Sequence, residues 1–375
     1  MANIVEGDRL GAVAPAPVVG LEGIVVAETQ LSHVDGQAGR LEIAGHSVED
    51  LARSMAIEEI ADLLWRVGSG SHHAAVRPAL GQARRLAHER VRRLGDALGQ
   101  PASMDALRAS VAHLTPGGDD QQNAVAITAA VAVFAAHTSR KRRGLKLIEP
   151  DPSLGHAEDY LRMLRGSAAT PEENAALQRY WAAVVDHGMN ASTFTARVVA
   201  STGSDLVSAV TAALGALKGP LHGGAPGPVL EMLHAISTPE RARPWLEATL
   251  ARGERIMGMG HRVYRVRDPR AEVLEAAVRL LASSNASDGL KLAQSVEQEA
   301  TLLLNARHPE RPLSANVEFY TAVLLNALHI PVEDFTPTFA ASRVIGWCAH
   351  VMEQKRTGRL IRPSSIYRRP EFAQA

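Results

Sequence analysis

Cysteine is nearly absent from this sequence, which has Cys348 alone among its 375 residues. A single thiol excludes an intrachain disulfide and fits a reducing compartment. The sequence also has no Cys/His spacing typical of a metal site, so we expect no bound metal. The simplest interpretation of Cys348 is a small residue in the core.

An excess of charge of either sign is absent as well. Lysine plus arginine number 40 and aspartate plus glutamate number 40, which gives a formal net charge of +0. A neutral chain has no bulk attraction to nucleic acid or to a membrane surface, so we expect neither as a partner. With 46% hydrophobic and 21% charged residues, the composition is that of an ordinary globular protein.

Long apolar runs are missing too. The most apolar stretch, residues 124–136, is shorter than the roughly 20 residues that span a bilayer, and we interpret it as a buried helix. The first residues, Met-Ala-Asn-Ile-Val-Glu-Gly-Asp, lack the basic segment and apolar run of a signal peptide. Together these features predict a cytoplasmic protein, long enough for two domains.

Strand signals are confined to the first 45 residues. A β-branched run lies within residues 20–28, Asp35-Gly36 is a turn signal, and Leu41–Ile43 can pair back as a small hairpin. After that, caps such as Ser47 and Thr170 open one helix after another. We predict an all-α fold that follows an irregular arm over residues 1–20. Helices are expected to begin at residues 47, 192, 228, 238 and 336. Further helices are expected over residues 57–67, 75–98, 122–137, 170–186, 205–218, 269–283, 289–306 and 316–328.

Residues 256–270 combine several features of a ligand-binding site within one short stretch. Gly258 and Gly260 allow the backbone to approach a ligand, and His261 can hold or move a proton near neutral pH. Asp268-Pro269 is typical of an N-cap followed by a first-turn proline, which places Arg270 where the helix dipole disfavours a cation. We therefore expect an anion near Arg270. The alternative interpretation of the whole stretch is a basic surface loop.

Other candidates lie outside this stretch. His187 and His222 each lie at a helix end or in a glycine-containing loop, as His261 does. Arg343 shares a helix face with two aromatic residues, and a buried arginine needs an anion, either a structural carboxylate or a substrate. Glu318 is the one carboxylate among uncharged neighbours. It is either a base tuned by burial or an acid that completes a helix cap.

Seven segments in order carry a resemblance to a known family. They are Asp186–Thr193, Gly219–Ala225, Met257–Tyr264 with Asp268–Arg270, Asn316–Tyr320, Phe335–Pro337, Arg343–His350 and Arg362-Pro363. Together they resemble the citrate synthase family in its short bacterial form, which includes 2-methylcitrate synthases. The resemblance extends from residue 20 to residue 367.

The resemblance implies an all-α homodimer with two domains in each subunit. The large domain would comprise residues 1–219 and 329–375, with a C-terminal tail that reaches the other subunit. The smaller domain, residues 220–328, would close over the substrates. The implied reaction condenses acetyl-CoA with oxaloacetate and hydrolyses the citryl thioester, a step of the tricarboxylic acid cycle. No cofactor is implied, because acetyl-CoA is a substrate.

The resemblance also implies roles for individual residues. His222 would hydrogen-bond the thioester oxygen, His261 would polarise the oxaloacetate ketone and protonate the alkoxide, and Glu318 would be the catalytic base. Oxaloacetate would be bound by His187, His261, Arg270, Arg343 and, from the other subunit, Arg362. Coenzyme A would meet the backbone of Ile256, Met257, Gly258, Met259 and Gly260, with Arg265 and Arg311 near its phosphates.

Two positions depart from the family pattern. The base is usually an aspartate, and Glu318 is longer by one methylene. Pro226 stands where the family often has asparagine, in the loop that carries His222. Two alternatives to citrate synthesis stay open. One is 2-methylcitrate synthesis from propionyl-CoA, whose site residues are the same and whose acyl group differs by one methylene. The other is a non-catalytic paralogue that binds coenzyme A or dicarboxylates, which only the departure at Glu318 supports.

Overall fold

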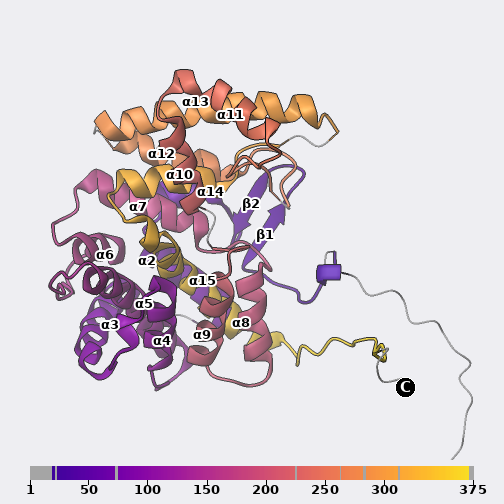
Figure 1. Ribbon diagram of the computed structural model, residues 1–375. Coiled ribbons are helices and arrows are strands. Elements are labelled where there is room, and N and C mark those ends of the chain that lie inside the picture. The colour runs from indigo at the N-terminus through magenta and orange to yellow at the C-terminus, as the bar shows by residue number, and fades with distance from the viewer. Residues whose placement is uncertain are drawn as a thin grey trace, which may run out of the picture.

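The computed structural model describes residues 19–21, 23–71, 75–223, 226–261, 263–281, 284–310 and 313–370. The predicted arm over residues 1–20 therefore lies almost entirely outside the described residues. Within them the regular secondary structure is helical apart from one small sheet (Figure 1). The all-α fold is confirmed. None of the described helices is both long and apolar enough to cross a bilayer.

The sheet has three antiparallel strands in the order β1 (Ser32–Asp35), β2 (Arg40–Ile43) and β3 (His46–Ser47). Asp35 pairs with Arg40, so the predicted turn and the second strand are confirmed. The first strand, however, is 32–35 and not the β-branched run before it. That run has no strand partner, and its Val25 is 85% exposed. Leu41 and Ile43 are buried and fix the hairpin to the core.

The predicted helix starts are largely confirmed by their caps. Ser47 Oγ accepts a hydrogen bond from the Asp50 amide, and Thr170 forms a full capping box with Glu173. The first nine helices are α1 (Val48–Ser54), α2 (Ile57–Ser69), α3 (Val76–Arg90), α4 (Ser103–Ala112), α5 (Asp120–Arg142), α6 (His156–Arg165), α7 (Pro171–Val184), α8 (Ala191–Ser201) and α9 (Leu206–Leu217).

The second half continues in the same manner. Its helices are α10 (Pro226–Ile236), α11 (Ala242–Ala251), α12 (Pro269–Leu280), α13 (Ser284–Arg307), α14 (Val317–Ala327) and α15 (Phe335–Thr357). Short 3₁₀ turns cover Val19–Leu21, Val91–Arg93, Ala97–Gly99, Pro239–Arg241 and Val332–Asp334.

Some predicted boundaries are wrong. The helix expected over 75–98 ends at Arg90 and breaks into two 3₁₀ turns around Gly95, whose positive φ of 58° leaves the helical region. The α10 helix begins at Pro226 instead of residue 228, since proline suits the first helical position. The α8 cap is Asn190 instead of Ser192.

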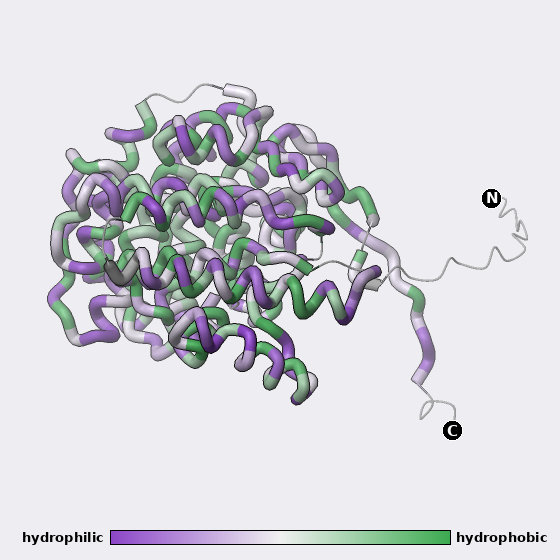
Figure 2. Tube along the Cα trace, turned by 90° about the horizontal axis from the view of Figure 1, so that it is seen from above, coloured by the Kyte–Doolittle hydropathy of each residue, from purple (hydrophilic) through white to green (hydrophobic). Residues whose placement is uncertain are grey.

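Helix α15 is the centre of the larger body. It packs against α2, α5, α7, α8 and α9, and its residues 340–352 are almost all buried. Helices α10–α14 lie together above that body in Figure 1, with α12 in contact with both α7 and α14. The division at residues 220–328 stays a prediction. After α15 the chain runs away from the helices as an extended tail (Figure 2).

Candidate active site

His187 lies in the loop between α7 and α8, close to His261. The centroids of the two rings are 5.6 Å apart, and Tyr264 packs on both. His187 Nε2 is 3.1 Å from the Tyr264 hydroxyl. Burial, followed by the charge of Arg270, holds the pKa of His187 well below its usual range. The ring is therefore neutral at physiological pH.

His222 lies between α9 and α10, with its Nε2 2.8 Å from Ser192 Oγ. Trp347 Nε1 donates a hydrogen bond to the same Ser192 hydroxyl. The single hydrogen of that hydroxyl is donated either to Asn190 Oδ1 or to His222 Nε2. When it goes to His222 Nε2, the neutral ring carries its own hydrogen on Nδ1. Burial, with the charge of Arg343, lowers the pKa of His222 to about 4.

The orientation of His261 is set by its own loop. Its Nδ1 accepts hydrogen bonds from the amides of Val263 and Tyr264, at 3.0 and 3.2 Å. The neutral ring must then carry its hydrogen on Nε2, which lies 3.5 Å from Arg270 Nη2. Burial and Arg270 lower the pKa of His261 to about 4. Two donors that face each other leave room for a shared acceptor, such as a ligand oxygen.

Arg270 opens α12 as the sequence predicts, with Asp268 as the N-cap and Pro269 in the first turn. The anion expected near Arg270 is in part Asp268 itself, which accepts from Arg270 Nε at 3.0 Å and Nη2 at 2.7 Å. Asp268 also accepts from the Val317 amide, at 3.2 Å. This carboxylate thus joins the start of α12 to the start of α14, where Glu318 lies.

Arg343 is buried in α15 over the ring of Phe339, with a distance of 4.5 Å from its guanidinium carbon to the ring centroid. Its Nε donates to the Val184 carbonyl at 2.5 Å. Among the described residues no carboxylate forms an ion pair with it. Burial lowers its pKa to about 10 despite the opposing effect of Asp186, so it stays charged near neutral pH. A buried cation without an ion pair favours a bound anion.

Glu318 is the second residue of α14, and Asn316 caps the helix by accepting from the Glu318 amide at 3.1 Å. The cap therefore uses the amide of Glu318, and within the described ranges no other residue's side chain donates to its carboxylate. Burial raises the pKa of Glu318, and Arg270 opposes that rise. A carboxyl whose pKa is raised by burial is a stronger base once it is ionised.

Residues 256–260 run beside the start of α14. Gly260 N donates to the Ser314 carbonyl at 2.7 Å, and Asn316 N donates to the Gly258 carbonyl at 3.0 Å. Gly258 and Gly260 have φ of 74° and 83°. A Cβ on Gly258 would lie 2.9 Å from Phe319, so this glycine also serves packing within the chain. Arg265 is exposed, and Arg311 lies outside the described residues.

Comparison with known proteins places this site in a family. The family model described as citrate synthase, C-terminal domain, matches residues 20–364. The citrate synthase of Haloferax volcanii is 40% identical, over 93% of this chain and 94% of its own. The 2-methylcitrate synthase of Mycobacterium tuberculosis is 37% identical, over 93% of this chain and 89% of its own.

The chain belongs to the citrate synthase family. It is thus an enzyme of the type that transfers an acyl group. The structure of Thermoplasma acidophilum citrate synthase in a ternary complex with carboxymethyl coenzyme A and oxaloacetate superposes with a TM-score of 0.81 at 28% identity. That likeness covers 94% of this chain and 96% of the other. The two-domain all-α architecture of citrate synthases is therefore the architecture of this chain.

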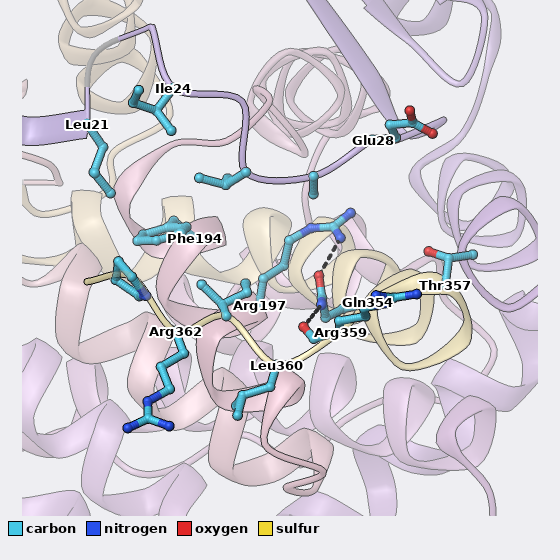
Figure 3. Close-up of a pocket in the computed structure, with 15 residues that line it drawn as sticks. Leu21, Ile24, Glu28, Phe194, Arg197, Gln354, Thr357, Arg359, Leu360 and Arg362 are labelled. Atoms are coloured by element: carbon cyan, nitrogen blue, oxygen red, sulfur yellow. Dashed lines mark hydrogen bonds between the residues drawn. The ribbon is translucent and has the colours of Figure 1, made fainter. Parts of the chain in front are cut away.

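Arg362 is not brought to this citrate synthase site by its own subunit. It lies exposed in the tail and lines a separate pocket of about 540 Å³ between residues 21–28, α8 and the tail (Figure 3). In that view its guanidinium points away from Arg197. The Arg197 side chain is engaged with the residues around the end of α15, including Gln354 at 2.9 Å. A role for Arg362 in oxaloacetate binding therefore requires a second subunit.

Sequence reasoning missed a buried polar chain behind His187. Asp186 accepts from His350 Nε2 at 3.1 Å and from Ser32 Oγ at 2.5 Å. His350 Nδ1 in turn accepts from Arg197 Nε at 3.0 Å. A signal was present, because Arg343, Trp347 and His350 recur at the four- and seven-residue spacing of one helix face.

The basic run Ser139–Gly144 ends α5, and its residues 141–144 are exposed as expected of a solvated helix end. Ser139 and Arg142 hydrogen-bond the buried Asp334 at the start of α15, and Arg140 Nε donates to the Lys146 carbonyl. These hydrogen bonds join the end of α5 to the start of α15 and to the loop after α5.

Among the described residues no group of three metal-ligating side chains occurs. Independence of metal stays a prediction.

We expect His222 and His261 to stay neutral down to about pH 4. Their folded pKa lies below the 6.5 of an exposed ring. The stability linked to each is therefore full above about pH 6.5 and is lost as the pH falls toward 4. Ring ¹⁵N chemical shifts at pH 6, assigned with His222→Gln and His261→Gln variants, should report neutral tautomers. An inflection of either ring near pH 6.5 would contradict the burial argument.

Proposed function

We propose that this enzyme is a citrate synthase that condenses acetyl-CoA with oxaloacetate and water to give citrate and coenzyme A. The observation that carries the proposal is the convergence of a buried Arg343 without an ion pair, neutral histidines and a carboxylate with a raised pKa. A dicarboxylate needs arginine forks, and a thioester methyl needs a positioned base. No resident cofactor takes part in this chemistry.

Oxaloacetate is held by His187, His261, Arg270 and Arg343, with Arg362 from the partner subunit. One carboxylate pairs with Arg343, which has no competing ion pair among the described residues. The ketone oxygen accepts from His261 Nε2, and Arg270 lies beside it. These donors stabilise the negative charge as the ketone becomes an alkoxide. The alkoxide is finally protonated by His261.

Glu318 removes a proton from the methyl group of acetyl-CoA. The resulting enolate is stabilised by a hydrogen bond from His222 Nδ1 to the thioester oxygen, in the tautomer that Ser192 favours when its hydroxyl donates to Nε2. The enolate carbon attacks the ketone carbon and forms the new carbon–carbon bond. Water then cleaves the citryl thioester and releases coenzyme A.

Coenzyme A binds along the backbone of residues 256–260, which lies against the α14 start that carries Glu318. Arg265, which is exposed beside this strip, and Arg311 meet its phosphates. This placement brings the thioester end toward Glu318 and the adenine end toward the strip. The Thermoplasma relative binds a coenzyme A derivative together with oxaloacetate, which supports both substrate classes.

A functional homodimer in the cytoplasm, acting in the tricarboxylic acid cycle, completes the proposal. The exposed extended tail carrying Arg362 supports the dimer, and the single cysteine supports a reducing compartment. Residues 220–328 move as the smaller domain. A non-catalytic role rests only on the longer side chain of Glu318, and the raised pKa of that carboxyl group favours a catalytic base instead.

The competing function is 2-methylcitrate synthesis, favoured by the likeness to the Mycobacterium tuberculosis enzyme. The two acyl groups differ by one methylene, worth about 1–3 kcal/mol in a pocket, or roughly 10- to 200-fold in kcat/KM. Thiol release should be measured with acetyl-CoA and propionyl-CoA at saturating oxaloacetate. A higher kcat/KM for acetyl-CoA is expected. A higher value for propionyl-CoA would establish the alternative.

A further inference from the structure

The β1–β2 hairpin touches both histidine loops. In Figure 1 the hairpin rises from the larger body toward the loops below α10–α14. At its base, Ser32 Oγ donates to Asp186 at 2.5 Å and accepts from the Gly188 amide at 2.9 Å. Those two residues flank His187. The base of the hairpin therefore sets the backbone of the His187 loop.

The tip of the hairpin meets the loop that carries His261. The Gly36 carbonyl accepts from the Arg265 amide at 2.8 Å. A Cβ built on Gly36 would lie 2.3 Å from the Val263 carbonyl oxygen, closer than real atoms approach. The neighbouring amides of Val263 and Tyr264 hold His261 Nδ1. The tip therefore packs directly on the turn that orients the His261 ring.

The hairpin itself is braced. Asp35 accepts from the amides of Gln37 and Ala38, at 3.1 and 2.9 Å, and pairs with the Arg40 side chain at 3.2 Å. Leu41 is buried against the core. The third strand, β3, pairs with β2 on its other side. With these contacts the hairpin is held at its turn, in its ladder and against the core, so a displacement at one end is expected to reach the other.

We propose that the hairpin is a strut in which Ser32 and Gly36 are positioning residues for His187 and His261. It sets the spacing of the two rings, and with it the length of the ketone-bearing dicarboxylate that fits between them. The choice of dicarboxylate rests on the proposed function, whereas the mechanical coupling of the two loops does not. None of the roles proposed for catalysis uses the hairpin.

The first test is Gly36→Ala with Gln37→Ala as its matched control. The φ of Gly36 is not in the left-handed region, so alanine acts through the contact with Val263 and not through backbone strain. Gln37 is an exposed neighbour in the same turn. We expect Gly36→Ala to lower kcat/KM for oxaloacetate by about 10- to 100-fold, since a shift of roughly 1 Å costs that much. Gln37→Ala should retain the unmodified value.

The second test needs no turnover and covers the case in which Gly36→Ala fails to fold. Hydrogen exchange of the Arg265 amide is compared in the unmodified protein, Ser32→Ala and Ser32→Thr. A change at the base should speed exchange at the tip several-fold, and threonine should restore protection because it keeps the hydroxyl.

Unchanged exchange of Arg265 in Ser32→Ala would overturn the strut, as would equal kcat/KM in the two tip variants. Failure of the proposed function looks different. The unmodified protein would then form no product from oxaloacetate, while the exchange experiment would still report whether the loops are coupled.

Discussion

Replacing Glu318 by glutamine should lower kcat by about 10²- to 10⁴-fold, the usual contribution of a positioned general base. Glutamine keeps nearly the same shape but cannot accept the methyl proton. Exchange of the acetyl-CoA methyl hydrogens with deuterated water, followed by mass spectrometry in the presence of a non-reacting oxaloacetate analogue, should fall to the background rate. Binding of oxaloacetate should change little, because Arg343 and the histidines remain.

The raised pKa of Glu318 gives a second readout of the same role. The base must be ionised, so kcat/KM should rise with pH through a value above the usual 4.5 of a glutamate, and Glu318→Gln should lose that limb. Glu318→Asp is the informative control, since aspartate is the common residue of the family at this position. Methyl exchange at the normal rate in Glu318→Gln would exclude this residue as the base.

Replacing Arg343 by alanine should raise KM for oxaloacetate by about 10²- to 10³-fold, on the order of 3–4 kcal/mol, as expected when one partner of a buried charge pair is removed. The fold should persist, because no described carboxylate loses an ion pair. Arg343→Lys should recover only part of the affinity, since an ammonium lacks the planar fork. Steady-state kinetics at saturating acetyl-CoA give KM, calorimetric titration with oxaloacetate gives the dissociation constant, and thermal unfolding of each variant reports whether the fold persists.

The same variant tests the shared site. Arg362→Ala should lose activity for a different reason, because we propose that Arg362 completes the site of the partner subunit. The assay uses oxaloacetate near the KM of the unmodified protein, where the weakened binding leaves each variant nearly inactive. When Arg343→Ala and Arg362→Ala proteins are mixed and allowed to exchange subunits, a mixed dimer has one site with both defects and one with neither. Random exchange restores about a quarter of the sites. Confirmed exchange without any recovered activity would refute the contribution of the tail.

The local features of this chain were readable from its sequence. Capping at Ser47 and Thr170, the Asp268-Pro269 helix start and the buried character of residues 124–136 depend on contacts within a few residues. They are therefore visible in short windows. The same holds for Glu318 and the three histidines as candidates, since residue type and a place at a helix end suffice to single them out.

Boundaries and pairings needed the tertiary structure. The β-branched run 24–28 has the local propensity of a strand, yet residues 32–35 take the place beside β2, where Ser32 bonds to Asp186 and the following Gly36 meets the His261 loop. Ser192 suits a cap as well as Asn190 does. The hydroxyl of Ser192 is instead positioned by Trp347 and His222, which lie far away in sequence.

The electrostatics of the site were decided by tertiary structure as well. Nothing local tells whether Arg270 or Arg343 has a carboxylate partner. The fold gives Arg270 its own cap, Asp268, and leaves Arg343 buried over Phe339 without an ion pair among the described residues. The sequence by itself determined which groups are available. Burial and long-range packing decided which of them are neutral, paired or ready for a ligand, because desolvation depends on every element that surrounds a group.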